Sequence, residues 1–308
     1  MNLELSLHGR HYEFEYPPHG NSDHLPMAWL AMTGLGASGS RRDDFACAYV
    51  SRLVPRAPGH PDQARQQTLL AELERRGIAA VLAEHLPRLI SGWYRAAYHP
   101  LIRLGYGVEF QVPAEVAAGL AYLEACGPSP RLAELAAHAR HTGGLSGLEL
   151  LRQAADATLD PDSAAAFDPR AETVLAHPHA ADLAMVLDDN LRTMSRAALA
   201  AFAATHDFFA LHLMTASHAF RLLRPWAGPH ADAVMNLGLL AGYCAIGGPE
   251  LPSGPPAVMA PTPSRERLLA LCRDDEHDFK VAYSAWAQAR HWHDPAYLTA
   301  VETYLAPT

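Results

Sequence analysis

Apolar residues recur at three- and four-residue intervals along most of the chain from Met27 onward, which is the period of an amphipathic helix. Pro, Ser or Asp stands at the start of several such segments, and Gly follows several of their ends, as in capped helices. Runs of Val, Ile and Thr are nearly absent after residue 16. The clearest helical segments are 61–77, 113–127, 264–279 and 294–306. The pattern predicts an all-α protein, an irregular domain of many helices.

The N-terminus shows a different pattern, because residues 3–7 and 12–16 alternate apolar with polar side chains. A period of two predicts a small β-hairpin, and residues 8–10 (His-Gly-Arg) would form its turn. A loop rich in Pro and Gly follows and leads to the first long helix at about Pro26. We therefore expect one short hairpin ahead of an otherwise helical fold.

Further segments rich in Pro and Gly, at 127–130, 159–169 and 247–263, mark loops between the predicted helices. The longest of them, 247–263, could separate a C-terminal pair of helices from the rest of the chain. About 45 residues would bury little apolar surface alone, so we predict a single helical domain over residues 1–308. No repeat of fixed period stands out, which argues against a helical solenoid.

The charge of the chain excludes several classes of function. The net charge is −9, and no run of five or six basic residues offers a surface for nucleic acid or for an anionic membrane. The most apolar stretch, 197–223, is broken by His206, Asp207, His212 and His218, so no membrane span is expected. The first 16 residues contain no secretory signal pattern, and the four cysteines are widely spaced. We expect a cytoplasmic protein with reduced thiols.

The common catalytic motifs are missing from the chain. There is no GxxxxGK[ST], GxSxG or HExxH sequence. The glycine-rich segment 34–40 follows a predicted helix instead of a strand, so we interpret it as a helix C-cap and not as a dinucleotide-binding turn. Nucleotide binding by these routes therefore has no support.

Histidine is abundant, with 18 residues, whereas lysine is scarce. Four histidines lie in apolar helical contexts: His24 ahead of Pro26, His99 directly ahead of Pro100, His212 in a strongly apolar segment, and His277 three residues before Lys280. His277 and Lys280 share a helix face at this spacing. The residues alone also allow helix caps, core histidines and a charged helix end, so they leave the function open.

Two further histidines, His206 and His218, lie six residues on either side of His212. Six residues turn a helix by about 240° net, so only one of the three is expected to point inward, and the others are expected to face solvent or to bridge helices. His218 is the reserve candidate if His212 faces elsewhere.

Four segments together resemble the motifs of the questin oxidase-like family, whose fungal members cleave an anthraquinone ring in polyketide pathways. The segments are DHLPMAWLAMTGLGAS from Asp23, HPLIRLGYGVE over 99–109 followed by PAEVA, DFFALH over 207–212, and DEHDFK over 275–280. They occur in the family's order. Asp23 stands where the family pattern often has Asn.

The resemblance implies a metal site. A characterised branch of the family holds a non-haem iron through four histidines and a carboxylated lysine, which would be His24, His99, His212, His277 and Lys280 here. Imidazole suits iron, with zinc and manganese as alternatives. A buried lysine is driven toward the neutral amine, which can take up carbon dioxide to form a carbamate with carboxylate-like oxygens.

The resemblance also implies an oxygenase that uses dioxygen on an aromatic or polyketide-like small molecule, with NADPH as a candidate cosubstrate. Tyr106 and Glu109, on the same segment as His99, are candidates to orient a ligand, or else a packed core residue and a helix salt bridge. Two alternatives stay open. One is a non-catalytic helical protein with a structural zinc or no metal. The other is a hydrolase with a lysine carbamate between two metals, which the acidic residues 274–276 would have to support.

Overall fold

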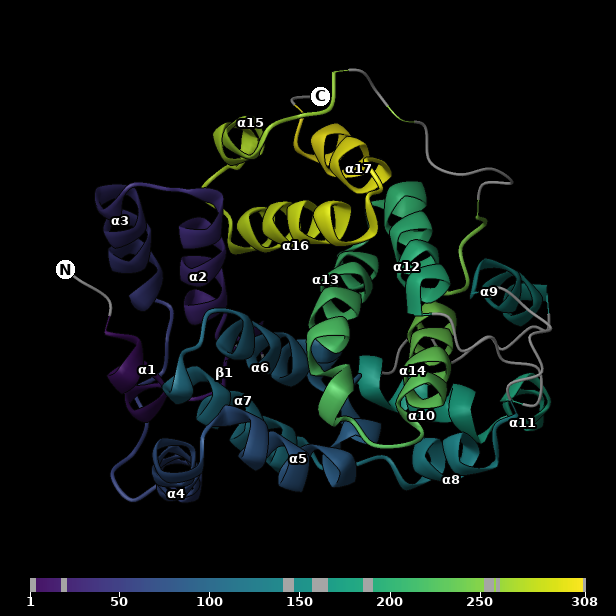
Figure 1. The fold of residues 1–308 in the computed structure, drawn as a ribbon, viewed down its shortest axis with the longest axis horizontal. Coiled ribbons are helices and arrows are strands. Elements are labelled where there is room, and N and C mark those ends of the chain that lie inside the picture. Colours follow the sequence, from purple (N-terminus) through teal and green to yellow (C-terminus); the bar gives the residue numbers. More distant parts are fainter. Residues whose placement is uncertain are drawn as a thin grey trace.

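The computed structural model describes residues 4–17, 21–140, 147–156, 166–184, 191–251, 258 and 261–306. Almost all of the described regular structure is helical, which confirms the predicted all-α fold (Figure 1). The helices of the first half are α1 (Leu5–His11), α2 (Leu25–Leu35), α3 (Gly39–Val50), α4 (Pro61–Arg76), α5 (Ile78–Leu89), α6 (His99–Glu109), α7 (Pro113–Cys126), α8 (Pro130–His138) and α9 (Gly147–Asp156). The second half contains α10 (Phe167–Ala176), α11 (Pro178–Ala184), α12 (Leu191–Thr205), α13 (Phe208–Leu223), α14 (Ala231–Ala245), α15 (Arg265–Leu271), α16 (Glu276–Trp292) and α17 (Ala296–Leu305). Short 3-10 helices are η1 (Ile90–Gly92), η2 (Ala96–Tyr98) and η3 (Arg224–Trp226).

The N-terminal hairpin exists, but the strands predicted for it were partly wrong. Residues 5–11 form α1, so the first predicted strand and its turn are helical. The hairpin instead pairs β1 (Glu15–Tyr16) with β2 (Asn21–Ser22) in antiparallel register. The reason is tertiary: the imidazole of His8 turns inward to the carboxylate of Asp23 at 2.6 Å, a contact that a local alternation pattern cannot reveal.

The apolar stretch 197–223, for which no membrane span was expected, contains parts of two helices. α12 ends at Thr205 and α13 begins at Phe208, and His206 between them has a positive φ of 51°. None of the described helices is long and apolar enough to cross a membrane. The predicted C-cap after α2 is confirmed, since Gly36 there is left-handed. The predicted loop 159–169 ends earlier than expected, because α10 begins at Phe167; residues 157–165 lie outside the described residues.

Helix α6 lies at the centre of the fold, between α7 and α13. Glycines allow these helices to approach closely: a Cβ at Gly119 of α7 would lie 2.6 Å from the backbone of Leu104, and one at Gly105 would lie 2.6 Å from the Cβ of Ala219 on α13. Dense packing of this kind holds helices in one arrangement. It places the N-terminus of α6 beside the N-terminal half of α13.

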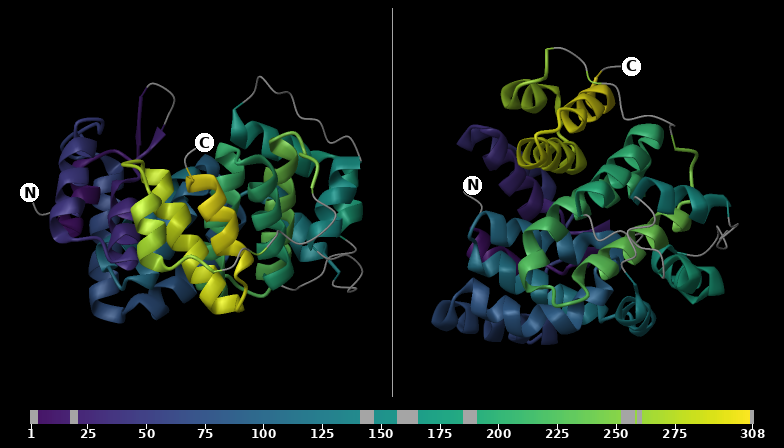
Figure 2. Two further views of the ribbon diagram at one scale, coloured as in Figure 1. Left: turned by 90° about the horizontal axis from the view of Figure 1, so that it is seen from above. Right: turned by 45° about the vertical axis from the view of Figure 1, so that its right-hand side comes forward.

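The C-terminal helices complete the same core. α16 packs on α2 and α13, and the ring of Tyr283 occupies the space that a side chain at Gly34 would need. Figure 2 shows these yellow helices lying between the purple N-terminal helices and the green helices α12 and α13. Buried apolar residues form one cluster from Phe14 to Leu305. The single domain over 1–308 stays a prediction, testable as one cooperative unfolding transition. Within the predicted loop 247–263, residues 252–257 and 259–260 lie outside the described residues.

Candidate metal centre

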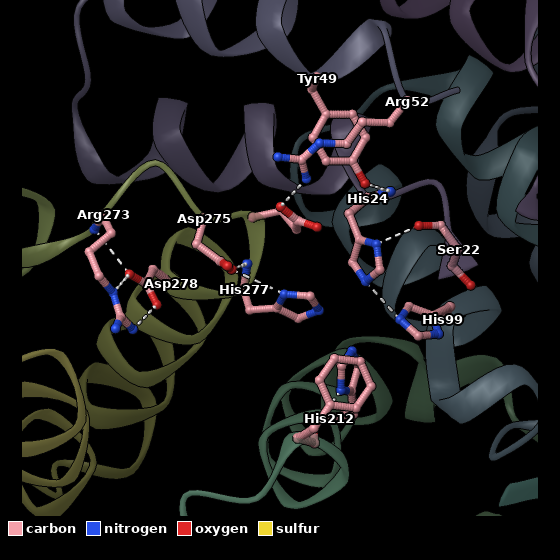
Figure 3. A network of polar contacts seen from close by, with 12 residues as sticks. Ser22, His24, Tyr49, Arg52, His99, His212, Arg273, Asp275, His277 and Asp278 are labelled. Atoms are coloured by element: carbon pink, nitrogen blue, oxygen red, sulfur yellow. Dashed lines mark hydrogen bonds and ion pairs between the residues drawn. The ribbon is translucent and has the colours of Figure 1, made fainter. Parts of the chain in front are cut away.

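Four histidines from four different helices converge at one point of the core (Figure 3). His24 is the N-cap of α2, His99 begins α6, His212 lies in the second turn of α13, and His277 lies in the first turn of α16. The ring centroids lie 4.5 Å apart for His24 and His99, 4.6 Å for His24 and His277, 4.6 Å for His99 and His212, and 5.3 Å for His212 and His277. These are the four histidines named from the sequence.

Each imidazole is held by a hydrogen bond from its Nδ1 atom. His24 Nδ1 donates to the Ser22 carbonyl at 2.5 Å, and His212 Nδ1 donates to the Phe208 carbonyl at 2.7 Å. His99 Nδ1 donates to the carbonyl of Ala96, and His277 Nδ1 lies 3.1 Å from a carboxylate oxygen of Asp275. Because these partners only accept, Nδ1 carries the hydrogen and Nε2 keeps a free lone pair. This is the arrangement of metal-ligating histidines, whose other nitrogen donates to an oxygen.

The four Nε2 lone pairs have no protein partner that can satisfy them. His24 and His99 place their Nε2 atoms 2.8 Å apart, although neither Nε2 carries a hydrogen in this tautomer. The Nε2 atoms of His212 and His277 have no hydrogen-bond partner. Burial lowers the pKa of all four imidazoles, so protonation does not relieve the repulsion. A transition-metal cation is the chemical species that this set of donors fits.

Lys280 adds a fifth group to this cluster. It is the only lysine in the chain, its side chain is 0% exposed, and its Nζ has no hydrogen-bond partner. It lies one turn after His277 on α16, and a positive charge on it would lower the pKa of all four histidines. Burial lowers the pKa of the amine to about 7. An uncompensated buried amine is costly, and such costs are concentrated at functional sites.

The backbone around His24 is held from two sides. Its N–H donates to the hydroxyl of Tyr49 at 3.2 Å, and the N–H of Leu25 donates to Asp23 at 3.1 Å. Asp23 in turn pairs with His8, and Arg103 lies 3.7 Å away. All three of these charged or titratable side chains are buried. Position 23, which often carries Asn in the family, therefore has a carboxylate here that is paired with buried basic side chains.

The start of α16, which carries His277 and Lys280, is also clamped. Asp275 caps the helix by accepting from the His277 N–H at 2.7 Å. The buried carboxylate of Asp278 accepts from the guanidinium of Arg273 at 2.8 and 2.9 Å and from its backbone N–H at 2.9 Å (Figure 3). A paired, bidentate interaction of this type restricts the segment that precedes the helix.

Tyr106 and Glu109 do not lie among the four histidines. The hydroxyl of Tyr106 donates to the backbone carbonyl of Lys280 at 3.2 Å, so it contacts the backbone of α16 and not the candidate ligand atoms. Glu109 lies 3.3 Å from Nε2 of His218, whose Nδ1 contacts the hydroxyl of Ser284 at 3.2 Å. These residues form a separate buried polar cluster.

The expectation that only one of the three histidines around α13 points inward was wrong, although His218 bridges α13 to α6 and α16, one of the two alternatives expected for the others. His206 is exposed, whereas His212 and His218 are both buried. The two point from different faces of α13, as their spacing requires, and each meets a different set of neighbours. His212 joins the other ligand candidates, and His218 pairs with Glu109.

A cavity of about 640 Å³ opens beside His24, His99 and His277. Its walls carry the aromatic side chains of Tyr16, Phe167, Phe208 and Phe209, and the carboxylates of Glu15, Asp168 and Glu276. Phe167 and Phe209 stack with centroids 4.8 Å apart. No Lys or Arg lines the described wall of this cavity. The volume lies in the range of sites for small organic ligands.

The sequence did not reveal Tyr49, Asp168 or Phe167, because each belongs to a helix that meets the site only in three dimensions. Phe208 and Phe209 were within the quoted DFFALH segment, and their aromatic pair was an available signal. Lys280, in contrast, was already named from the sequence, where the scarcity of lysine was visible in the composition.

The comparison with known proteins agrees with the resemblance seen in the motifs. A family model described as Questin oxidase-like matches residues 69–285, more than half of the chain, and this range includes His99, His212, His277 and Lys280. A questin oxidase from Aspergillus terreus (strain NIH 2624 / FGSC A1156) is 28% identical over 289 residues, covering 75% of this chain and 64% of that protein. The chain thus spans less than two thirds of that relative's length.

Proposed function

The chain belongs to the questin oxidase-like family, and from this premise we propose that it is an iron-dependent oxygenase acting on an aromatic, polyketide-like small molecule. The observation that carries the proposal is the convergence of four unpartnered Nε2 lone pairs and a buried lysine beside an aromatic-lined cavity. The name of the relative, questin oxidase, supports this reaction class.

The metal would be held by Nε2 of His24, His99, His212 and His277 and by Lys280 in carboxylated form. With its pKa lowered to about 7, the Lys280 amine is substantially neutral at physiological pH. The neutral nitrogen can attack carbon dioxide: a C–N bond forms, one proton leaves, and a carbamate anion results. The carbamate would present two oxygens that share one negative charge, whereas the protonated form of the amine cannot ligate a cation. The negative charge of the carbamate would lie among neutral imidazoles and would offset part of the metal's charge.

Iron bound there would supply the redox chemistry that dioxygen needs and that zinc lacks. NADPH is the candidate source of two electrons if one oxygen atom enters the product and the other leaves as water. Insertion of both atoms would need no reductant. The cavity gives small molecules access to His24, His99 and His277, which favours a catalytic over a structural metal, because structural zinc sites are closed.

The protein's own side chains would orient the substrate and exclude water. The ring of Phe208 lies 4.5 Å from that of His212 and 5.0 Å from that of His277, so it shields the imidazoles on the cavity side. The stacked rings of Phe167 and Phe209 offer an aromatic wall to a planar substrate. Three carboxylates without a lysine or arginine in the lining favour neutral substrates with hydroxyl donors over carboxylates.

The decisive experiment is metal analysis combined with oxygen uptake. Protein produced in iron-supplied medium and purified without added metals should contain about one iron per chain. It should consume dioxygen with a hydroxylated anthraquinone as the probe, assayed with and without NADPH. One zinc per chain with no oxygen uptake would support the structural alternative instead, and absence of any metal would refute the proposed centre.

The carbamate can be tested directly because the chain has only one lysine. Incubation with ¹³C-bicarbonate should give one side-chain carbamate signal in the ¹³C spectrum, apart from any signal of the N-terminal amine. The signal should fade as the pH falls below about 7, because protonation of the amine expels carbon dioxide. It should be missing from Lys280→Met. A spectrum identical for the two proteins would contradict carboxylation of Lys280.

Replacement of Phe209 by leucine tests the aromatic wall. Leucine keeps apolar volume but loses the stacking face, worth about 0.5–1.5 kcal/mol. The dissociation constant of the anthraquinone probe should therefore rise about 2- to 10-fold, as followed by fluorescence titration. Metal content should not change. Phe110→Leu is the matched control, since Phe110 stacks on Tyr106 outside the cavity; equal weakening by both variants would exclude a specific role for Phe209.

A further inference from the structure

The three residues that precede His99 all have left-handed backbone conformations. Ala96, Ala97 and Tyr98 have φ angles of 47°, 50° and 71°, and none of them is glycine. One non-glycine residue in this region costs on the order of 1 kcal/mol or more. Three in succession persist only where the surrounding structure holds them. The strain lies directly ahead of a candidate metal ligand, where such outliers tend to occur.

One side of this turn is held by the carboxylate of Asp168, which lies in the first turn of α10. Asp168 Oδ2 accepts a hydrogen bond from the Ala96 N–H at 3.0 Å, and the Ala97 N–H interacts with the same carboxylate. Asp168 is 72 residues away from Ala96 in the sequence. Among the described residues, Asp168 of α10 is the side chain whose acceptor oxygens face these two N–H groups.

The other end of the turn is held by packing. The ring of Tyr98 is fully buried and lies 5.2 Å from Trp93 and 5.4 Å from Phe167. A side chain at Gly242 would collide with the Tyr98 hydroxyl, so α14 leaves room for it there. Packing thus anchors Tyr98, and the Asp168 carboxylate is the polar anchor of the two alanines.

Asp168 and His99 interact with opposite ends of one peptide group in this turn. The N–H of Ala97 and the C=O of Ala96 belong to the same planar amide. Its N–H interacts with the Asp168 carboxylate, and its C=O accepts a hydrogen bond from His99 Nδ1. A carboxylate at the N–H end polarises the amide and makes its carbonyl a stronger acceptor. A stronger acceptor for the Nδ1 hydrogen raises the basicity of Nε2 as a metal ligand and fixes the orientation of the imidazole ring.

We propose that Asp168 is a positioning residue for His99, acting through the Ala96–Ala97 peptide group. It holds the left-handed turn and polarises the amide that directs His99 Nε2 into the centre. In many metal sites a carboxylate accepts a hydrogen bond directly from a metal-bound histidine. Here one peptide group would lie between the carboxylate of Asp168 and the imidazole of His99. The inference rests on the proposed metal site.

The test compares metal affinity in Asp168→Ala, Asp168→Asn and Glu172→Gln by competition with a chelator, using Co²⁺ as the probe ion. Asp168→Ala should weaken binding about 10- to 100-fold, as for loss of other outer partners of metal-bound histidines. It should also shift the visible absorption of the bound Co²⁺. Asp168→Asn keeps an amide oxygen as acceptor without the charge, so it should recover part of the affinity. Glu172 lies on the same helix and binds Tyr94 and Arg95, so Glu172→Gln should stay within about twofold of the wild type.

A second arm examines the strain without any metal. Ala97→Gly should not lower the melting temperature of the metal-free protein, because glycine accepts a positive φ. Ala117→Gly in the interior of α7 should lower it, by the usual cost of about 1 kcal/mol. Ala97→Gly should also recover affinity when combined with Asp168→Ala, since the relaxed turn needs less support.

The outcomes separate the two proposals. If the wild type binds no Co²⁺, the proposed centre fails. If the wild type binds and Asp168→Ala binds equally well with an unchanged spectrum, the positioning role is refuted while the centre stands. Equal losses in Asp168→Ala and Glu172→Gln would also refute it, because a general weakening of α10 would then explain both.

Discussion

Replacement of His99 by alanine is expected to remove most of the metal from the purified protein, and His277→Ala is expected to do the same. Each imidazole is one of a few donors in a buried site, and each is oriented by its own Nδ1 partner. Loss of a group that is hydrogen-bonded to a ligating histidine weakens metal binding by roughly 10- to 100-fold. Loss of the ligand itself should weaken binding by more. The metal content per chain after dialysis, measured by elemental analysis, gives the result.

Two exposed histidines supply the controls for this experiment. His138 and His177 lie at the ends of helices away from the centre, and alanine at either position should leave the metal content intact. Circular dichroism of each variant excludes unfolding as the cause of any loss. Full metal content in both His99→Ala and His277→Ala would refute the assignment of these ligands.

Lys280→Met is expected to abolish tight metal binding and, at the same time, to stabilise the metal-free protein. Methionine fills a similar volume without the amine. The fall in the lysine pKa from 10.5 to about 7 corresponds to a folding penalty on the order of 4 kcal/mol at pH 7. The metal-free variant should therefore melt several degrees higher than the metal-free wild type.

The sign of the pH dependence follows from the same shift. The unfolded chain binds a proton on Lys280 below about 10.5, whereas the folded chain does so only below about 7. The penalty therefore grows as the pH falls from 10.5 to 7 and is constant below 7. The stabilisation by Lys280→Met should be larger at pH 7 than at pH 9.5, as measured by denaturant unfolding of the metal-free proteins.

Gln288→Met is the matched control on the same helix. Gln288 is equally buried, but its amide accepts from Arg221 at 2.8 Å and donates to Ser217 at 3.4 Å. Its removal leaves these partners unsatisfied, so this variant should be destabilised. If Lys280→Met were destabilised to a similar degree, the amine would have to be satisfied in the metal-free protein, and the strain attributed to it would not exist.

The helical fold and the candidate ligands were accessible from the sequence, because both depend on local patterns. A period of 3.6 residues predicts helices wherever their buried face is long. Pro26 and Pro100 predict that His24 and His99 lie at helix starts, and the three-residue interval from His277 to Lys280 predicts a shared face. The resemblance of four segments then named these residues as a set.

Long-range packing decided the remaining features. Alternation at residues 3–7 predicted a strand, but residues 5–11 form helix α1, from which His8 contacts Asp23. Helical spacing separates His212 from His218 without indicating which neighbours each one meets. Those neighbours belong to α6, which precedes α13 in the chain, and to α16, which follows it, and each is more than 50 residues away from the histidine that it contacts.

The turn at residues 96–98 shows the physical reason most clearly. Nothing in the letters Ala-Ala-Tyr predicts three left-handed residues, since these residue types disfavour that conformation. The turn exists because Asp168 and the pocket around Tyr98, both formed by distant segments, stabilise it by more than its local cost. Local preference determined where the helices of this protein form, and only the assembled core determined which side chains meet and in what strained geometry they are held.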